Sequence, residues 1–156
     1  MVDASEVACA YARHNADNAA PAGRVSVLLG SLLEVMASQG EFAIILADPP
    51  WVPTAQVDRF PADPRSAIDG GEDGLDLVWD CLFVIGRHLQ ERGSAILQVG
   101  TLAQASAVRQ RLDMRPELRL EVRQCRVHGN RGALVLLARP GAAPVVRDLP
   151  AGEIPG

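Results

Sequence analysis

Short apolar runs separated by segments of helical pattern constrain the fold of this chain more than any other feature of its sequence. Four such runs, rich in Val, Ile, Leu and Ala, lie at residues 25–29, 42–47, 95–99 and 133–138. Runs that are apolar at successive positions suit strands that are buried on both faces of a sheet. The sequence therefore predicts an α/β fold in which helices cover a mostly parallel sheet.

Three helices are predicted around these strands. The first covers residues 5–18 and has Ser5 at the position of an N-cap. The second follows Gly74, and the third follows Thr101, which is also a suitable N-cap. Apolar residues recur at helical spacing in both of the later segments, as expected for helices that bury one face. These residues are Leu75, Val78, Leu82, Ile85 and Leu89 in the second helix, and Leu102, Ala105, Val108 and Leu112 in the third.

The C-terminal part of the sequence predicts an antiparallel hairpin. A more polar strand at residues 119–128 is followed by a Gly-Asn-Arg-Gly turn and then by the strand at 133–138. We therefore expect one antiparallel edge on the sheet. Because 156 residues suffice for one domain, we expect a single domain over residues 1–139. Residues 140–156, rich in Pro and Gly, are expected to form a flexible tail.

Composition and charge disfavour several classes of protein. The 15 basic residues, all Arg, are outnumbered by 19 acidic residues, and the formal net charge of −4 gives no basic surplus for nucleic acid. No apolar stretch reaches the roughly 18 residues of a membrane span, and the N-terminus does not read as a signal peptide. Cys9, Cys81 and Cys125 lack the spacing of a metal site. We expect a cytoplasmic protein with reduced thiols, no metal and no membrane association.

One connection is too long for the tight loop of an α/β unit. Residues 49–74 are rich in Pro, Gly and Asp and show no periodicity. Loops of this length in compact domains usually bind ligands or cover a site. This loop begins at the carboxyl end of the strand at 42–47, where open α/β sheets bind their ligands. The functional site is expected there.

The tetrapeptide Asp48-Pro49-Pro50-Trp51 directly follows that strand. The prolines lack amide donors and fix φ, so the Asp48 carboxylate and nearby carbonyls face the cleft as acceptors. Such acceptors suit an NH2 group, which they can hold with its lone pair directed at an electrophile. Trp51 would then pack on a planar substrate. The alternative is an Asp-Pro turn beside a core tryptophan, and the tetrapeptide alone leaves both interpretations open.

The same tetrapeptide resembles the Asn/Asp/Ser-Pro-Pro-Tyr/Phe/Trp motif of class I S-adenosylmethionine-dependent methyltransferases that act on nitrogen. The residues that follow it, Val52-Pro53 and then Gly-Gly-Glu-Asp-Gly-Leu-Asp at 70–76, are similar to a linked stretch of the HemK-like protein-glutamine N5-methyltransferases. The resemblance covers about residues 1–139. It implies a Rossmann-like methyltransferase sheet and S-adenosylmethionine as cofactor.

The resemblance implies roles for the residues around the motif. Asp48, with the backbone carbonyl of Pro49, would orient the nucleophilic nitrogen and form the catalytic pair. Pro50, Trp51 and Val52 would bind the substrate, with Trp51 stacking on it. Asp48 would also lie beside the methyl donor.

Two further positions match cofactor-binding positions of the family. Asp3 matches the acid that ends a strand and binds the ribose hydroxyls, and Ser31 falls where many relatives have an acid near the adenine. The family's first strand and its glycine-rich turn have no counterpart in this sequence, so we expect an N-terminally truncated sheet and weak cofactor binding. The strand at 25–29 would then pair with that at 42–47, or the open edge would form a homodimer.

The methyl acceptor is the least specified part of the resemblance. The family implies a protein glutamine side chain, with a translation release factor as protein substrate. Asp48 and Trp51 replace the family's Asn and Tyr, which leaves a small amine as another acceptor. The motif also resembles that of adenine-N6 methyltransferases, which the net acidity and residues 70–76 disfavour. A non-catalytic methyltransferase remnant, or a binding module, is the alternative from another class.

Overall fold

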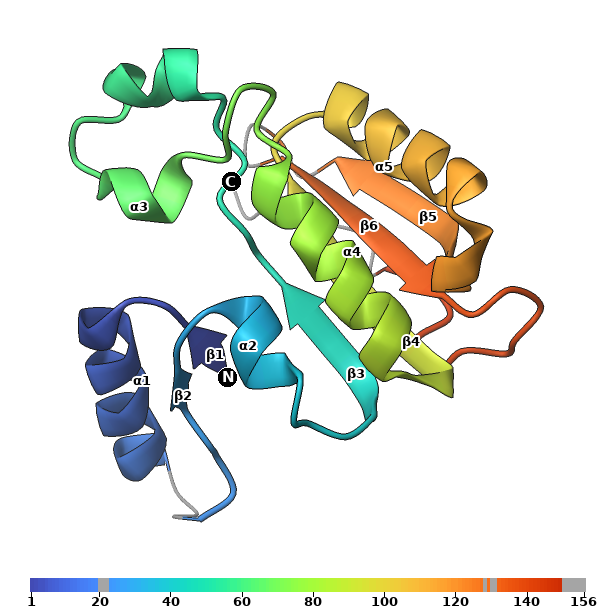
Figure 1. Ribbon diagram of the computed structural model, residues 1–156, viewed down its shortest axis with the longest axis horizontal. Coiled ribbons are helices and arrows are strands. Elements are labelled where there is room, and N and C mark those ends of the chain that lie inside the picture. The colour runs from blue at the N-terminus through green and yellow to red at the C-terminus, as the bar shows by residue number, and fades with distance from the viewer. Residues whose placement is uncertain (20–22, 128, 130–131, 150–156) are drawn as a thin grey trace. The chain divides into compact units, whose positions relative to one another are not determined.

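The structure, a computed structural model, divides the chain into two compact units, Met1–Gly40 and Glu41–Gly156. Each unit has its own sheet (Figure 1). The residues that the structure describes are 1–19, 23–127, 129 and 132–149.

The first unit is built on a two-stranded parallel sheet, in which Asp3 pairs with Leu29. The helix before the second strand begins as predicted, because Ala8 N–H donates to Ser5 Oγ at 3.2 Å. This bond satisfies one of the N–H groups that a helix leaves free at its first turn. The elements of the unit are β1 (Val2–Asp3), α1 (Glu6–Ala19), β2 (Leu28–Leu29) and α2 (Leu32–Met36).

The strand expected at 25–29 is reduced to β2, and its predicted pairing with the strand at 42–47 is wrong. The first residue of the chain supplies its partner instead. The Met1 amino group donates to Ser26 O at 2.7 Å, and Leu28 N–H donates to Met1 O at 2.9 Å. These bonds join one edge of β2 to β1.

The second unit contains a four-stranded mixed sheet in the order β3-β4-β6-β5. β3 and β4 are parallel, while β6 is antiparallel to both of its neighbours. The α/β fold class and the antiparallel C-terminal hairpin are confirmed, although the antiparallel strand lies inside the sheet and not at its edge. Asn130 and Arg131 of the predicted turn lie outside the described residues, as does His128, where the predicted strand before the turn ends. The elements are β3 (Phe42–Ala47), η1 (Thr54–Arg59), α3 (Arg65–Ile68), α4 (Asp76–His88), β4 (Leu89–Val99), α5 (Leu102–Met114), η2 (Pro116–Leu118), β5 (Glu121–Val127) and β6 (Ala133–Ala138).

The apolar stripe predicted on α4 forms much of the core of the second unit. α4 packs against β3 and β4 and crosses in front of the sheet in Figure 1. All five residues of the stripe are buried, although Leu75 only caps the helix and Leu89 lies outside it, as the first residue of β4. Their burial removes apolar surface from water, which is the main favourable term in folding.

The stripe predicted on α5 is correct except in its first turn. Ala105, Val108 and Leu112 are buried, whereas Leu102 is 56% exposed. The inward position of that turn is occupied by Gln104, which is only 7% exposed. A polar side chain is thus buried at the start of the helix.

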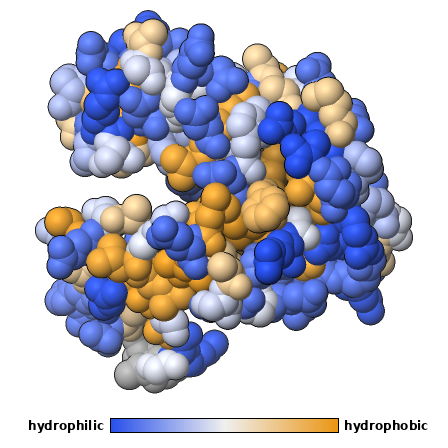
Figure 2. Space-filling model, viewed as in Figure 1, coloured by the Kyte–Doolittle hydropathy of each residue, from blue (hydrophilic) through white to orange (hydrophobic). Residues whose placement is uncertain are grey.

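β3 is an edge strand of this sheet and exposes apolar side chains. It pairs only with β4 among the residues that the structure describes. Phe42, Ile44 and Leu46 are exposed, and so is Phe83 on α4. Figure 2 shows apolar side chains on the surface of this unit.

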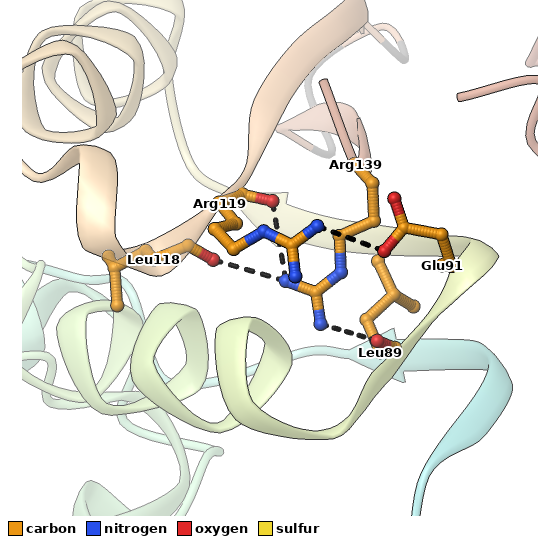
Figure 3. Close-up of polar contacts among 5 residues, drawn as sticks. All are labelled: Leu89, Glu91, Leu118, Arg119 and Arg139. Atoms are coloured by element: carbon orange, nitrogen blue, oxygen red, sulfur yellow. Dashed lines mark hydrogen bonds and ion pairs between the residues drawn. The ribbon is translucent and has the colours of Figure 1, made fainter. Parts of the chain in front are cut away.

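Arg139 directly follows β6 and is buried, at 5% exposure. Its Nη1 donates to Leu118 O at 3.2 Å and to Arg119 O at 3.3 Å, and its Nη2 donates to Leu89 O (Figure 3). Arg119 has a φ of 51° and pairs with Glu91 at 3.0 Å. Burial, and then the neighbouring Arg119, lower the pKa of Arg139. The guanidinium joins the start of β4 to the turn before β5.

Residues 140–149, the first part of the predicted tail, are hydrogen-bonded to the sheet. Val146 N–H donates to the buried Ser94 Oγ at 2.8 Å, and Ser94 Oγ lies 3.3 Å from Val146 O, to which it donates. Leu149 is buried, and its N–H donates to Gln124 Oε1 at 2.6 Å. The rest of the predicted tail lies outside the described residues.

Candidate functional site

The expected site is at the carboxyl ends of two parallel strands. Ala47 at the end of β3 pairs with Leu97 near the end of β4. Because the two strands run in the same direction, Asp48 and Gly100, which follow them, emerge at the same edge of the sheet. The long loop from Pro49 leaves from this edge, as predicted.

Backbone hydrogen bonds order this loop and return its far end to the motif. Val52 forms a parallel bridge with Asp69. Val52 N–H donates to Ile68 O at 2.9 Å, and Gly70 N–H donates to Val52 O at 2.9 Å. The Val52 side chain is buried. The loop therefore contains a strand-like bridge, together with the short helices η1 and α3, where the sequence showed no periodicity.

The Asp69 carboxylate stabilises the returning part of the loop. Its Oδ1 accepts hydrogen bonds from Thr54 Oγ1 at 2.6 Å and from Gly71 N–H at 3.1 Å. Its Oδ2 accepts from Arg65 Nε at 3.0 Å. The Thr54 hydroxyl, the Gly71 amide and then Arg65 lower the pKa of Asp69. The ionised carboxylate thus holds three parts of the loop together.

Gln104 of α5 connects the motif, the loop and the end of β4. Its Oε1 accepts from Gly100 N–H at 2.8 Å. Its Nε2 donates to Trp51 O at 2.9 Å and to Asp73 O at 3.0 Å, and lies 3.4 Å from Gly74 O. Gln104 is not among the site residues predicted from the sequence. The feature of the sequence that could have indicated it is a polar residue next to Ala105, which belongs to the predicted buried stripe of the helix.

Two glycines allow the backbone to approach Trp51 closely. A Cβ at Gly100 would lie 2.2 Å from Cε3 of the Trp51 indole. A Cβ at Gly74, whose φ is +76°, would lie 2.3 Å from the Trp51 carbonyl oxygen. The half-buried indole therefore packs on the backbone of Gly100, and the loop passes directly over the Trp51 carbonyl.

Asp48 and Pro49 present acceptors that nothing described in the chain occupies. The Asp48 carboxylate is partly exposed, and its partial burial raises its pKa. Among the described residues, no group donates a hydrogen bond to this carboxylate or to Pro49 O. The Pro49 ring is buried, and the Pro50 carbonyl faces Gly70, where a Cβ would lie 2.7 Å from its oxygen. The exposed Asp48 carboxylate is thus available to a ligand, whereas Pro49 is buried and its carbonyl accepts no hydrogen bond from the described residues.

Asp3 and Ser31 lie together in the Met1–Gly40 unit. Gly30 N–H donates to Asp3 O at 3.0 Å, which places both residues at the carboxyl ends of β1 and β2. Asp3 Oδ1 accepts from Ser5 N–H at 2.8 Å. Ser31 precedes α2 and makes no side-chain capping bond. Asp48 belongs to the other unit.

The cysteines are free in the structure. Burial, and then the nearby Asp80, raise the pKa of Cys81 to about 12. Cys9 is also buried, whereas Cys125 is half-buried. In the part of the chain that the structure describes, no three His, Cys, Asp or Glu side chains are grouped so as to bind a metal ion. None of the helices described is long and apolar enough to cross a membrane.

Curated relatives of this chain are glutamine methyltransferases. The ribosomal protein uL3 glutamine methyltransferase of Francisella tularensis is 31% identical over 104 residues, covering 64% of this chain and 33% of the relative. Release factor glutamine methyltransferases of Moorella thermoacetica and Geobacter sulfurreducens are 36% and 33% identical, over 64% and 69% of this chain. The resemblance indicated by the motifs is confirmed. The chain spans about a third of the length of these relatives, at 33%, 36% and 38%.

The fold is also that of a solved methyltransferase structure. Ribosomal protein L11 methylase from Lactobacillus delbrueckii subsp. bulgaricus matches 88% of this chain, and the match spans 55% of that protein, with a TM-score of 0.59 and 19% identity. No family model matches the sequence.

Proposed function

We propose that this chain is part of an S-adenosylmethionine-dependent N-methyltransferase that acts on a glutamine side chain of a translation protein in the cytoplasm. The names of its relatives, release factor and uL3 glutamine methyltransferase, support this class of acceptor. One observation carries the proposal. The Asp48 carboxylate and the Pro49 carbonyl directly follow β3 and accept no hydrogen bond from the described residues, which suits an NH2 group.

The proposed chemistry depends on orientation. The two N–H bonds of the acceptor would donate to Asp48 and to Pro49 O, which fixes the direction of the nitrogen lone pair. The exposed part of the Trp51 ring would stack on the planar amide. Asp48, whose pKa is raised by burial, is also able to accept the proton that the nitrogen loses after methylation. S-adenosylmethionine, when bound, supplies the electrophilic methyl group.

Asp3 and Ser31 fit the cofactor positions that the resemblance implies. The Asp3 carboxylate is half-buried at the end of β1, and its Oδ2 has no hydrogen-bond partner among the described residues. A carboxylate with a free oxygen suits the ribose hydroxyls, and the uncapped Ser31 hydroxyl suits a polar edge of the adenine.

Asp48 favours a second candidate acceptor, which is a small or protein-bound amine. Asp accepts hydrogen bonds only, whereas an Asn at this position could also donate one to the amide oxygen of a glutamine acceptor. An amine has no such oxygen. The choice between amide and amine is therefore decided at this one side chain.

Methyl transfer to intact proteins tests the proposal. The chain is incubated with isotopically labelled S-adenosylmethionine and with a bacterial release factor or uL3, and the products are mapped by mass spectrometry. Label on a glutamine nitrogen supports the main candidate, and label on an amine supports the second. Binding of either protein without transfer of label would contradict both and indicate a non-catalytic binding module.

A further inference from the structure

We propose that Gln104 is the positioning residue of this site. One buried amide fixes the Trp51 backbone and the loop at Asp73, and thereby sets where the acceptors of Asp48 and Pro49 lie. The catalytic consequence rests on the proposed function. The positioning itself is a property of the folded chain.

The hydrogen-bonding capacity of the Gln104 amide matches the groups around it. A glutamine side chain has two N–H donors and one carbonyl acceptor. The donors reach Trp51 O at 2.9 Å and Asp73 O at 3.0 Å, and the acceptor receives Gly100 N–H at 2.8 Å. These lengths are typical of well-formed hydrogen bonds. Each of the three backbone groups would lose a partner if the amide were removed.

The base of the side chain is fixed as well. Gln104 N–H donates to Thr101 Oγ1 at 3.1 Å, so the residue stands in the capped first turn of α5. The side chain is buried, which keeps water from replacing its bonds. Its amide is therefore held in one orientation before any ligand arrives.

The three bonds hold Trp51 from two sides. The Trp51 carbonyl is bound by Gln104, and the indole rests on Gly100, whose own amide is bound by the same side chain. Asp48 and Pro49 lie only three and two residues before this fixed point, and Pro49 and Pro50 limit backbone rotation between them. Loosening Trp51 would therefore misplace both acceptors.

Alternative side chains at this position separate positioning from packing. Gln104→Met keeps the volume and apolar stem but makes none of the three bonds. Gln104→Asn keeps the amide but is shorter by one methylene group, so it cannot span the same groups. Gln110 lies on the same helix and is exposed, so Gln110→Met is the matched control.

The first measurement does not depend on catalysis. In a Trp79→Phe background, Trp51 is the single tryptophan, because the chain has two. Acrylamide quenching of its fluorescence is measured where circular dichroism shows each variant folded. We expect the quenching constant to rise about twofold in Gln104→Met, because the ring is no longer held against Gly100, and to stay unchanged in Gln110→Met. The NMR chemical shift of the Gly100 amide is compared in the same variants. If neither this shift nor the quenching constant changes in Gln104→Met, the inference is overturned.

The second measurement tests the consequence for the reaction. We expect kcat to fall about 10- to 100-fold in Gln104→Met with the KM for S-adenosylmethionine unchanged, since misplaced groups lower the rate of the chemical step. If the substitution only reduced the amount of folded protein, the rate would fall in proportion to the folded fraction. Trp51 would then remain protected from acrylamide in the molecules that are folded. If Gln104→Met does not fold, Gln104→Asn gives the same comparison.

The two proposals fail in different ways. If no acceptor is methylated by the unsubstituted chain, the proposed function is wrong, and the Trp51 quenching still decides whether Gln104 positions the motif. If methylation occurs and Gln104→Met retains the kcat of Gln110→Met, the inference about Gln104 is wrong and the proposed function stands.

Discussion

The guanidinium of Arg139 donates a hydrogen bond to the backbone carbonyl of Arg119 at 3.3 Å, which holds two like charges near each other. Glu91 pairs with Arg119 at 3.0 Å and offsets part of the repulsion. Three backbone carbonyls in total depend on Arg139. This residue therefore organises the end of the sheet opposite the candidate site.

Replacing Arg139 with methionine is expected to destabilise the chain. Arg139→Met leaves three carbonyls without their donor, and at about 1 kcal/mol or more for each the free energy of unfolding falls by about 3 kcal/mol. Urea denaturation measures the change. Arg115→Met is the control, because the Arg115 side chain makes an exposed ion pair with Glu117, whose loss costs less than about 1 kcal/mol. Equal effects in the two variants would contradict the role given to Arg139.

Substitutions of Asp48 distinguish the two candidate acceptors. Asp48→Ala removes one of the two acceptors and is expected to lower kcat about 100-fold, equivalent to about 2.7 kcal/mol. Asp48→Asn keeps one acceptor oxygen and adds a donor, so activity on a glutamine amide should survive or rise. The exposed Asp58→Ala serves as the control. If Asn abolishes turnover as fully as Ala in folded protein, the negative charge is required and the acceptor is an amine.

The raised pKa of Asp48 predicts how the rate depends on pH. Partial burial favours the neutral form, so the carboxyl takes up a proton at a higher pH than an ordinary aspartate. The protonated form has lost acceptor capacity, and kcat/KM should therefore fall as the pH decreases through this raised pKa. The Asp48→Asn variant should lack that acidic limb. If kcat/KM of Asp48→Asn still falls at low pH with the same midpoint, the titrating group is not Asp48.

Asp69 predicts a titration in the loop. Its pKa is lowered by the Thr54 hydroxyl, the Gly71 amide and Arg65, so its contribution to loop order is present above the pKa of the unfolded chain. That contribution is lost as the pH falls through the lowered pKa of the folded state. The amide of Gly71, which donates to Asp69, should report this midpoint by NMR at a pH below that of ordinary aspartates. Asp69→Asn should abolish the titration of the Gly71 signal.

The thiols are expected to react at different rates. Cys81 is buried and has a pKa of about 12, so almost none of it is thiolate at neutral or mildly alkaline pH. Cys9 is buried as well, and Cys125 is the most accessible of the three. Iodoacetamide should therefore modify Cys125 first in the native protein, and all three thiols in urea. Mass spectrometry of the digested protein gives the order of modification. Modification of Cys81 before Cys125 would contradict the prediction.

The sequence located strands best where both faces are apolar. β3 and β6 match the predicted runs at 42–47 and 133–138. β4 extends from Leu89 to Val99, whereas the prediction began at residue 95, because its first half contains Gln90, Glu91 and Arg92. Polar residues in an exposed half of a strand give no apolar run to detect.

The site was predicted in part, for a similar reason. The tetrapeptide from Asp48 to Trp51 is local and follows an apolar strand, so its position at the edge of the sheet could be predicted. Gln104 contacts Trp51 across 53 residues of sequence, through the packing of α5. A single glutamine has no pattern that predicts such a contact, and only the fold brings the two residues together.

The paired hydrogen bonds between Ser94 and Val146 determine where this unit can be cut or fused. A chain shortened at residue 139, after the last strand, would leave the buried Ser94 hydroxyl without its partner and expose the surface that Leu149 covers. A fusion partner or affinity tag should therefore be joined beyond Leu149 rather than directly after β6. The folded part of this unit thus continues from the end of β6 at Ala138 at least to Leu149, whose N–H is bound by Gln124.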